Sequence, residues 1–132
     1  MKIQNLKQIM IKKVPLKVKV ANTKKQKSAG LQNVDNLPNN HGMLFCYPKA
    51  KILSFWMKDT IIPLSIAFID ENKIITQIED LDPRDMKSVK SKNRSKWALE
   101  VNKGWFEENN INVGDEITTP DYKKIKIHIS NR

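Results

Sequence analysis

A polar tripeptide, Lys58-Asp59-Thr60, directly follows the apolar segment Phe55–Met57. An ammonium, a carboxylate and a hydroxyl at a strand end can converge on a small ligand when aromatic rings form apolar walls around them. Trp56 and Trp105 are the rings that we expect there. In the alternative interpretation, Lys58 and Asp59 form an ion pair that ties down a turn, and Trp56 lies in the core.

A second carboxylate, Glu100, stands in an apolar segment that is typical of a strand, where alternation places it on one face with the small Ala98. Either backbone donors and a basic partner such as Lys58 satisfy it, or burial raises its pKa and suits it to general acid or base chemistry. Paired with Asp59, it would resemble the two carboxylates of glycoside cleavage. A small hydrolase or lyase using Asp59 and Glu100 is therefore one hypothesis.

Other chemistry has little support in the sequence. His41 and His128 lie far apart and lack ligand spacing, so we expect no metal and no cofactor. The single cysteine, Cys46, excludes an internal disulfide and is expected in the core. Nucleotide hydrolysis is set aside because the glycines stand singly and form no phosphate-binding loop: Gly30, Gly42, Gly104 and Gly114.

Positive charge is concentrated in two stretches. The net charge is +10, and residues 1–30 contain nine lysines and no acidic residue. A second stretch contains only Asp85 against six basic residues: Arg84, Lys87, Lys90, Lys92, Arg94 and Lys96. Such clusters predict binding to a polyanion such as nucleic acid, or to an anionic membrane surface. Alternatively, the lysines only solvate strand edges and loops and oppose aggregation.

The elements that would position these groups are short strands. At 132 residues, the chain is long enough for one domain. Apolar residues alternate with lysines in 16–20 and again near the C-terminus, whereas Leu64–Ile69 is apolar on both faces. We predict a mainly β, compact barrel or sandwich of about eight short, mostly antiparallel strands with two short helices. The expected strands are 16–20, 43–47, 52–57, 64–69, 74–79, 97–101, 116–118 and 125–129, and the helices are 24–29 and 104–109.

Local signals define several element ends. Thr23 and Gln26 form a capping-box pattern, and Gly30 is suited to the position after the helix. Asp70–Lys73 is expected to connect two strands as a hairpin, with Asn72 taking a positive φ. Asn110 is expected to end the second helix in the left-handed region.

Several motifs, taken in order, resemble family 192 of the domains of unknown function over roughly residues 16–118. The resemblance implies a small, mostly β domain, often behind a signal peptide or lipoprotein anchor, with no established activity. The most specific block is Phe55–Leu64. The others are Val18–Thr23, Gly30-Leu31, Leu37-Pro38, His41–Phe45, Ala67–Asp70, Ala98–Asn102, Gly104-Trp105 and Gly114-Asp115.

The sequence departs from the family pattern at four places. The family usually has Asn at the position of Asp59 and Asp at that of Ser65, so a carboxylate is either lost at the central strand or supplied by Asp59. It also usually has an Arg after the Gly-Leu pair, which 32–36 lacks. The loop before Trp97 is strongly basic here. We therefore divide the chain into a basic N-terminal extension (1–15), a family-like β domain (16–118) and an added C-terminal strand (119–132).

The leading hypothesis is a non-enzymatic ligand- or partner-binding or accessory protein, with its pocket at the end of the Phe55–Thr60 strand. The partner would be a small ligand or another protein, and the protein itself is expected to be a monomer. Met1–Lys13 lacks the apolar run of a signal peptide, and no 18-residue apolar run occurs elsewhere. We accordingly expect a cytoplasmic protein, although relatives are often exported.

Overall fold

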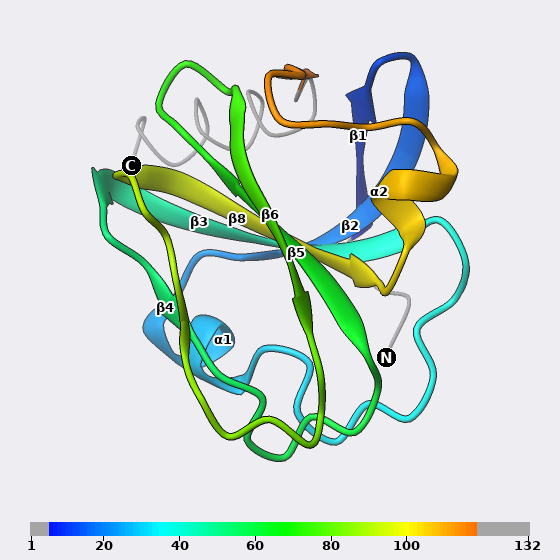
Figure 1. Cartoon of the computed structure of the whole chain (residues 1–132), viewed down its shortest axis with the longest axis vertical. Coiled ribbons are helices and arrows are strands. Elements are labelled where there is room, and N and C mark those ends of the chain that lie inside the picture. Colours follow the sequence, from blue (N-terminus) through cyan, green and yellow to red (C-terminus); the bar gives the residue numbers. More distant parts are fainter. Residues whose placement is uncertain (1–5, 119–132) are drawn as a thin grey trace.

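The structure is a computed structural model that describes residues 6–118. Its strands are β1 (Leu6–Ile11), β2 (Val14–Ala21), β3 (His41–Lys51), β4 (Ser54–Phe55), β5 (Leu64–Ile69), β6 (Ile75–Leu81), β7 (Val89–Lys90), β8 (Ser95–Asn102) and β9 (Ile117–Thr118), and its helices are α1 (Lys24–Ala29) and α2 (Trp105–Glu108). Seven strands form one sheet in the order β6-β5-β8-β3-β2-β1-β9 (Figure 1). Neighbours are antiparallel except for β2 and β3. The predicted mainly β class is confirmed.

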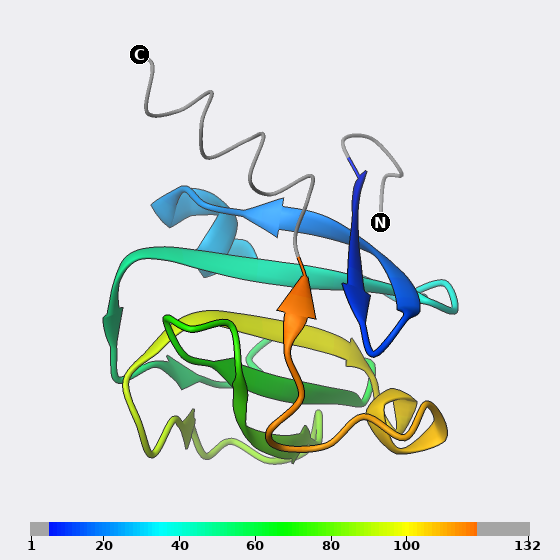
Figure 2. The same ribbon diagram turned by 90° about the horizontal axis from the view of Figure 1, so that it is seen from above.

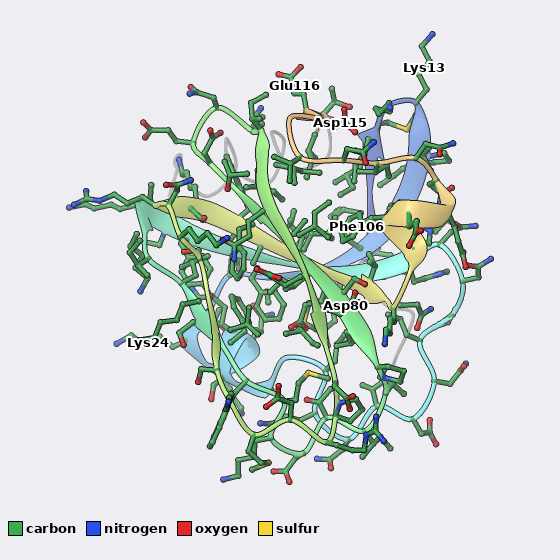
Figure 3. The ribbon with its side chains drawn as sticks, viewed as in Figure 1. Lys13, Lys24, Asp80, Phe106, Asp115 and Glu116 are labelled. Carbon is green, nitrogen blue, oxygen red and sulfur yellow. The ribbon has the colours of Figure 1, made fainter. Side chains whose placement is uncertain are left out.

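The sheet curls into a half-barrel whose two outer strands approach each other at one end (Figure 2). Ile74 forms an antiparallel bridge with Glu116. The Ile75 amide donates to the Asp115 carbonyl at 2.9 Å, and the Ile117 amide donates to the Lys73 carbonyl at 2.9 Å. Asp115 and Glu116 lie at this meeting point in Figure 3. The edge of β6 therefore does not remain fully open for pairing with another chain.

Two apolar cores lie on opposite faces of the sheet. The inner core is enclosed by the curl and draws on all seven strands and on α2: Ile9, Ile11, Leu16, Val18, Leu44, Cys46, Ala67, Ile69, Ile75, Trp97, Leu99, Val101, Trp105, Phe106, Ile111 and Ile117. The outer core lies on the opposite face: Ala21, Leu31, Leu37, Met43, Phe45, Leu53, Met57, Leu64, Ile66, Phe68, Leu81 and Ala98. Both faces of β5 are covered, as its continuous apolar sequence predicts.

Two segments cover the outer face. One is the crossover from β2 to β3, which contains α1; the other is the small ribbon of β4 and β7 (Figure 1). Helix α1 begins with the predicted capping box, in which Thr23 Oγ1 accepts from the Gln26 amide and Gln26 Oε1 accepts from the Thr23 amide, both at 3.1 Å. Leu31 follows the helix and buries its side chain in the outer core. The capping box thus fixes the start of the helix, and Leu31 holds the crossover against the sheet after the helix ends.

The structure differs from the sequence prediction in three elements. Residues assigned to the N-terminal extension form β1, because Ile9 and Ile11 bury fully in the inner core. The expected strand 52–57 shrinks to β4, which leaves the main sheet to pair with β7. In the β5–β6 turn, Lys73 rather than Asn72 has a positive φ, of 68°. The Asp70 carboxylate accepts from the backbone amides of Asn72 and Ile74, on either side of Lys73, and so fixes that turn.

The C-terminal strand predicted at 125–129, and with it the proposed added segment 119–132, lies outside the described residues. Within residues 6–118, no helix is long and apolar enough to cross a membrane. Asn110 has the predicted left-handed conformation after α2, with φ 55°.

Candidate functional site

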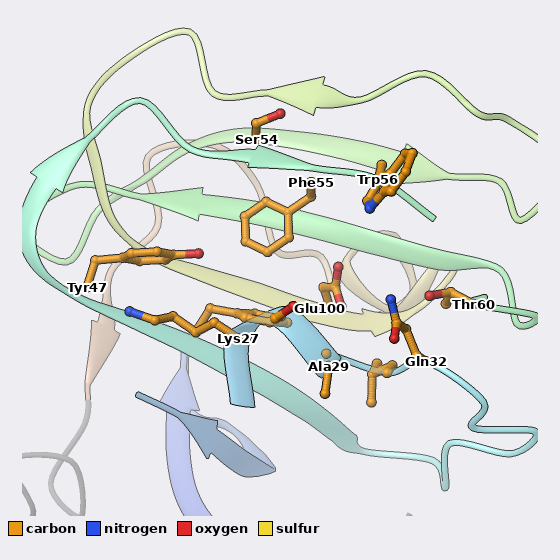
Figure 4. Close-up of a pocket in the computed structure, with 13 residues that line it drawn as sticks. Lys27, Ala29, Gln32, Tyr47, Ser54, Phe55, Trp56, Thr60 and Glu100 are labelled. Atoms are coloured by element: carbon orange, nitrogen blue, oxygen red, sulfur yellow. The ribbon is translucent and has the colours of Figure 1, made fainter. Parts of the chain in front are cut away.

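A pocket of about 210 Å³ lies on the outer face, between the end of α1, strand β3 and the ribbon strand β4 (Figure 4). The crossover supplies one wall, the sheet supplies the floor, and β4 with the residue after it supplies the opposite wall. The lining residues are Lys27, Ser28, Ala29, Gly30, Leu31, Gln32, Phe45, Tyr47, Ser54, Phe55, Trp56, Thr60 and Glu100.

Glu100 supplies the carboxyl group of the pocket floor. It lies in β8 at the centre of the sheet, opposite Met43 of β3 on one side and Ile66 of β5 on the other. Only 6% of the residue is exposed, and none of residues 6–118 gives its side chain a hydrogen bond or an ion pair. Burial raises its pKa to about 8. The carboxyl is therefore mostly protonated at neutral pH and can both donate and accept a hydrogen bond.

Aromatic rings form much of the pocket wall. Phe45 and Phe55 pack edge to face, with ring centroids 4.9 Å apart. Trp56 is 51% exposed and lies across the opening in Figure 4. Tyr47 is half-buried, and its hydroxyl points into the pocket (Figure 4). Burial, and secondarily the charge of Glu100, raise the pKa of Tyr47 to about 12, so this hydroxyl remains a donor at any physiological pH.

Lys27 is held at the edge of the pocket as a fixed cation. Its Nζ donates to the Cys46 carbonyl at 2.9 Å and lies 4.1 Å from the centroid of the Tyr47 ring. Lys51 also lies over this ring, at 5.2 Å. Burial, followed by the charge of Lys51, lowers the pKa of Lys27. Lys24, on the same helix, points instead towards solvent in Figure 3.

The wall after α1 depends on a glycine. Gly30 has φ 49° and ψ −130°, a conformation that residues with a side chain rarely adopt. It turns the chain so that Leu31 enters the outer core and Gln32 lines the pocket. The next residue, Asn33, donates its amide to the Asp59 carbonyl at 2.8 Å. This bond joins the two opposite walls.

The structure brings three of the six predicted ligand-binding residues together: Trp56, Thr60 and Glu100. Thr60 is buried, and its hydroxyl donates to the Lys58 carbonyl at 3.3 Å. Lys58 and Asp59 are exposed in the turn beyond the pocket and do not line it. Lys58 Nζ lies 5.8 Å from the Trp56 ring centroid, and the ion pairs among residues 6–118 are made by other residues.

Trp105 lies on the other side of the sheet, in the inner core. It is 2% exposed, and its Nε1 donates to Asn40 Oδ1 at 2.9 Å. We expected it to be a pocket wall; instead it anchors α2 against the sheet. The pocket ring opposite Trp56 is Tyr47, whose position two residues after Phe45 in β3 gave a signal in the sequence. No such signal exists in the sequence for Lys27 and Gln32, because the path of the crossover brings them to the pocket.

The turn at Asp59 explains a departure from the family pattern. Asp59 has φ 56°, and Asn is among the residues that tolerate this left-handed region best. The residue type at position 59 is therefore limited by the backbone conformation of the turn. Ser65, the other departure, lies beside a different carboxylate: its hydroxyl donates to Asp80 Oδ1 at 2.9 Å and accepts from the Gly104 amide at 3.1 Å. Asp80, rather than Asp59, brings a carboxylate to this part of the central strands.

The basic residues of the loop before β8 spread along the outside of the molecule. All are exposed except Lys96, which is half-buried with its Nζ 5.4 Å from the Trp97 ring centroid. Arg84 pairs with Asp82 at 2.9 Å. Arg94 and Lys96 border a second hollow, which also contains Lys49 and the acidic residues Asp70 and Glu71. Among residues 6–118, no group of three or more His, Cys, Asp or Glu side chains is arranged to hold a metal ion.

A family model described as "Uncharacterized ACR", family 192 of the domains of unknown function, matches residues 7–119. The chain belongs to this family. Its matched region begins within β1 and therefore includes most of that strand. No curated protein matches the chain.

Two solved structures resemble this member of family 192. One is a protein from Sinorhizobium meliloti described as a candidate transcription regulator, with 26% identity, a TM-score of 0.79, and coverage of 85% of this chain and 90% of that one. The other is a protein of unknown function from Novosphingobium aromaticivorans, with 22% identity, a TM-score of 0.82, and coverage of 89% of each chain. The second similarity shows the fold alone.

Proposed function

We propose that this protein is a non-enzymatic binding domain that holds a small polar molecule in the pocket above Glu100. The observation that carries the proposal is a buried carboxyl with no hydrogen-bond partner among residues 6–118, in the floor of a pocket open to solvent. A buried polar group without a partner destabilises the fold by roughly 1–3 kcal/mol. A ligand that satisfies the carboxyl removes that penalty.

The other lining groups support recognition rather than catalysis. Tyr47 supplies a hydroxyl, Gln32 an amide and Lys27 an ammonium from different sides of the pocket (Figure 4). Asp59 does not line the pocket, so the hydrolase or lyase hypothesis lacks its second carboxylate there. A few convergent polar groups within aromatic walls are typical of binding pockets.

The test is a two-dimensional amide and indole NMR titration of the full chain with a set of small polar compounds. Binding should shift the Trp56 indole signal and the backbone signals of Tyr47 and Glu100. The same compound should bind at least tenfold more weakly to Glu100→Ala. The matched control is Glu108→Ala, which removes an exposed carboxylate from α2 and should leave affinity unchanged. Shifts confined to other surfaces, or equal affinity for both variants, would overturn the proposal.

A second candidate function is binding to nucleic acid or another polyanion through the lysines of the N-terminal stretch and of the loop before β8. Two observations favour it: the loop cations are mostly exposed, and the structurally similar S. meliloti protein is described as a candidate transcription regulator. Phosphate contacts of this kind weaken steeply with added salt.

Fluorescence anisotropy with labelled single- and double-stranded DNA and RNA tests this candidate at low and at physiological salt. A variant with Lys87, Lys90, Lys92 and Arg94 replaced by Gln should lose most of the binding. Glu100→Ala should retain it, because none of these four residues lines the pocket. Absence of binding at low salt would exclude this function.

A further inference from the structure

We propose that the ligand of this pocket is a neutral, polyhydroxylated molecule of single-ring size, such as a monosaccharide or cyclic polyol. This inference rests on the proposed function and names the ligand class of the same site. It follows from the charges, the ring positions and the size of the pocket.

The charges of the pocket disfavour a cationic ligand. Such a ligand would lie beside the fixed ammonium of Lys27, with Lys51 also over the Tyr47 ring, and like charges at short range disfavour binding in a poorly solvated site. An anionic group only accepts hydrogen bonds, so it would leave the acceptor oxygens of the Glu100 carboxyl and the Gln32 amide without a donor. A neutral hydroxylated ligand avoids both problems.

The polar groups of the pocket can bind the hydroxyls of a ligand, because a hydroxyl donates one hydrogen bond and accepts others. The Glu100 carboxyl, the Gln32 amide and the Tyr47 hydroxyl can each donate and accept a hydrogen bond, whereas Lys27 only donates. None of residues 6–118 gives the side chains of Glu100 or Gln32 a hydrogen-bond partner. An apolar ligand would leave these groups unsatisfied, at a cost in free energy for each.

Trp56 suits one face of such a ring. Its indole is 51% exposed at the opening, although burying a tryptophan is normally favourable. The C–H faces of a sugar ring are apolar and can cover an aromatic ring, while the ring's hydroxyls point sideways to polar groups. With about 210 Å³, the pocket is smaller than the roughly 300–1,000 Å³ that is usual for drug-sized ligands. One six-membered ring is therefore the size that we expect.

The experiment compares compounds that share a ring and differ in charge. NMR titrations of the full chain use neutral hexoses, pentoses and inositol, together with glucosamine as the cation, glucuronate as the anion and cyclohexanol as the apolar ring. We expect at least one neutral polyol to shift the Trp56 indole and to bind at least tenfold more tightly than its charged analogue. Trp56→Ala should weaken that binding at least tenfold. Ile61→Ala, which removes an exposed apolar side chain outside the pocket, should not.

Each outcome decides between the two proposals. Tighter binding of glucosamine, glucuronate or cyclohexanol at the same signals would overturn the ligand class but retain the binding pocket. Polyol shifts away from the pocket would overturn the ligand class as well. If no compound of any charge shifts a pocket signal, both proposals fail. Because Trp56 is half-exposed, its variant should keep the amide spectrum of the folded chain, which serves as the check on folding.

Discussion

Successive residues of β8 point to opposite faces of the sheet, and the two faces have different surroundings. Leu99 and Val101 are fully buried in the inner core, whereas Ala98 and Glu100 face the outer core. On the inner face the Nε1 atom of Trp105 has a hydrogen-bond partner, Asn40. On the outer face a carboxyl remains without one among residues 6–118, under a pocket. The inner face is therefore a closed core, whereas the outer face combines a core with a carboxyl that borders a pocket.

The largest expected effect is on the inner face. Leu99→Ala should lower the free energy of unfolding by about 4 kcal/mol, because a fully buried leucine leaves a cavity in a closely packed core. Denaturation by urea, followed by circular dichroism, measures the change. A loss below about 1 kcal/mol would show that the inner core is not tightly packed, and the contrast between the faces would fail.

The next effect is pH-dependent and comes from the outer face. The pKa of Glu100 is about 8 in the folded protein, above its ordinary 4.5, so the folded state binds the extra proton between these values. Stability from the protonated form is present below about pH 4.5 and is lost as the pH rises through about 8. Relative to Glu100→Gln, the wild type should lose about 3 kcal/mol of unfolding free energy between pH 5.5 and pH 9.

Urea denaturation of both proteins across this pH range gives that difference directly. Glu108→Gln is the matched control: its carboxylate is exposed, so it should follow the wild type. A parallel pH dependence for the wild type and Glu100→Gln would mean that a donor reaches the carboxyl in solution, and the functional contrast between the faces would disappear.

A smaller effect tests whether Asp59 contributes to stability through its backbone conformation rather than through its carboxylate. Asp59→Val should lower the unfolding free energy by about 1–2 kcal/mol, because a β-branched side chain is strained at φ 56°. Asp59→Asn should be tolerated without loss. Thermal denaturation distinguishes the two variants. Equal destabilisation by both would assign the effect to the carboxylate instead.

The smallest expected effect is at the mouth of the pocket. Trp56→Ala should change the unfolding free energy by less than about 0.5 kcal/mol, because half of this residue is already exposed. The same change should damage binding most clearly. Urea denaturation compared with Ile61→Ala gives the measurement. A loss of several kcal/mol would place Trp56 in the core and make the outer face resemble the inner one.

Elements whose signals are local could be predicted from the sequence. Leu64–Ile69 was identified with its observed ends because both of its faces are apolar. Helix α1 was identified because the Thr23 and Gln26 side chains cap its start. The unusual chemistry of Glu100 was also visible, since one carboxylate stands in an otherwise apolar strand.

Features that depend on pairing across the sheet could not be predicted. The side of the sheet on which Trp105 lies is fixed by α2 and by its bond to Asn40, which is distant in sequence. Strand β1 was missed because its period-two burial becomes visible only once Ile9 and Ile11 face the enclosed core. Gln32 reaches the pocket because Gly30 redirects the chain, and sequence periodicity does not describe that turn.

The only parallel neighbours in the described sheet, β2 and β3, require a long connection, and that crossover supplies the pocket wall from Lys27 to Gln32. A single contiguous segment thus supplies one wall of the pocket, while the inner core contains none of its residues. Exchange of the whole segment between homologous chains would change this wall as one unit, and the scaffold that receives it would keep its own strand register. The shape and polarity of the pocket could therefore change by recombination within one loop.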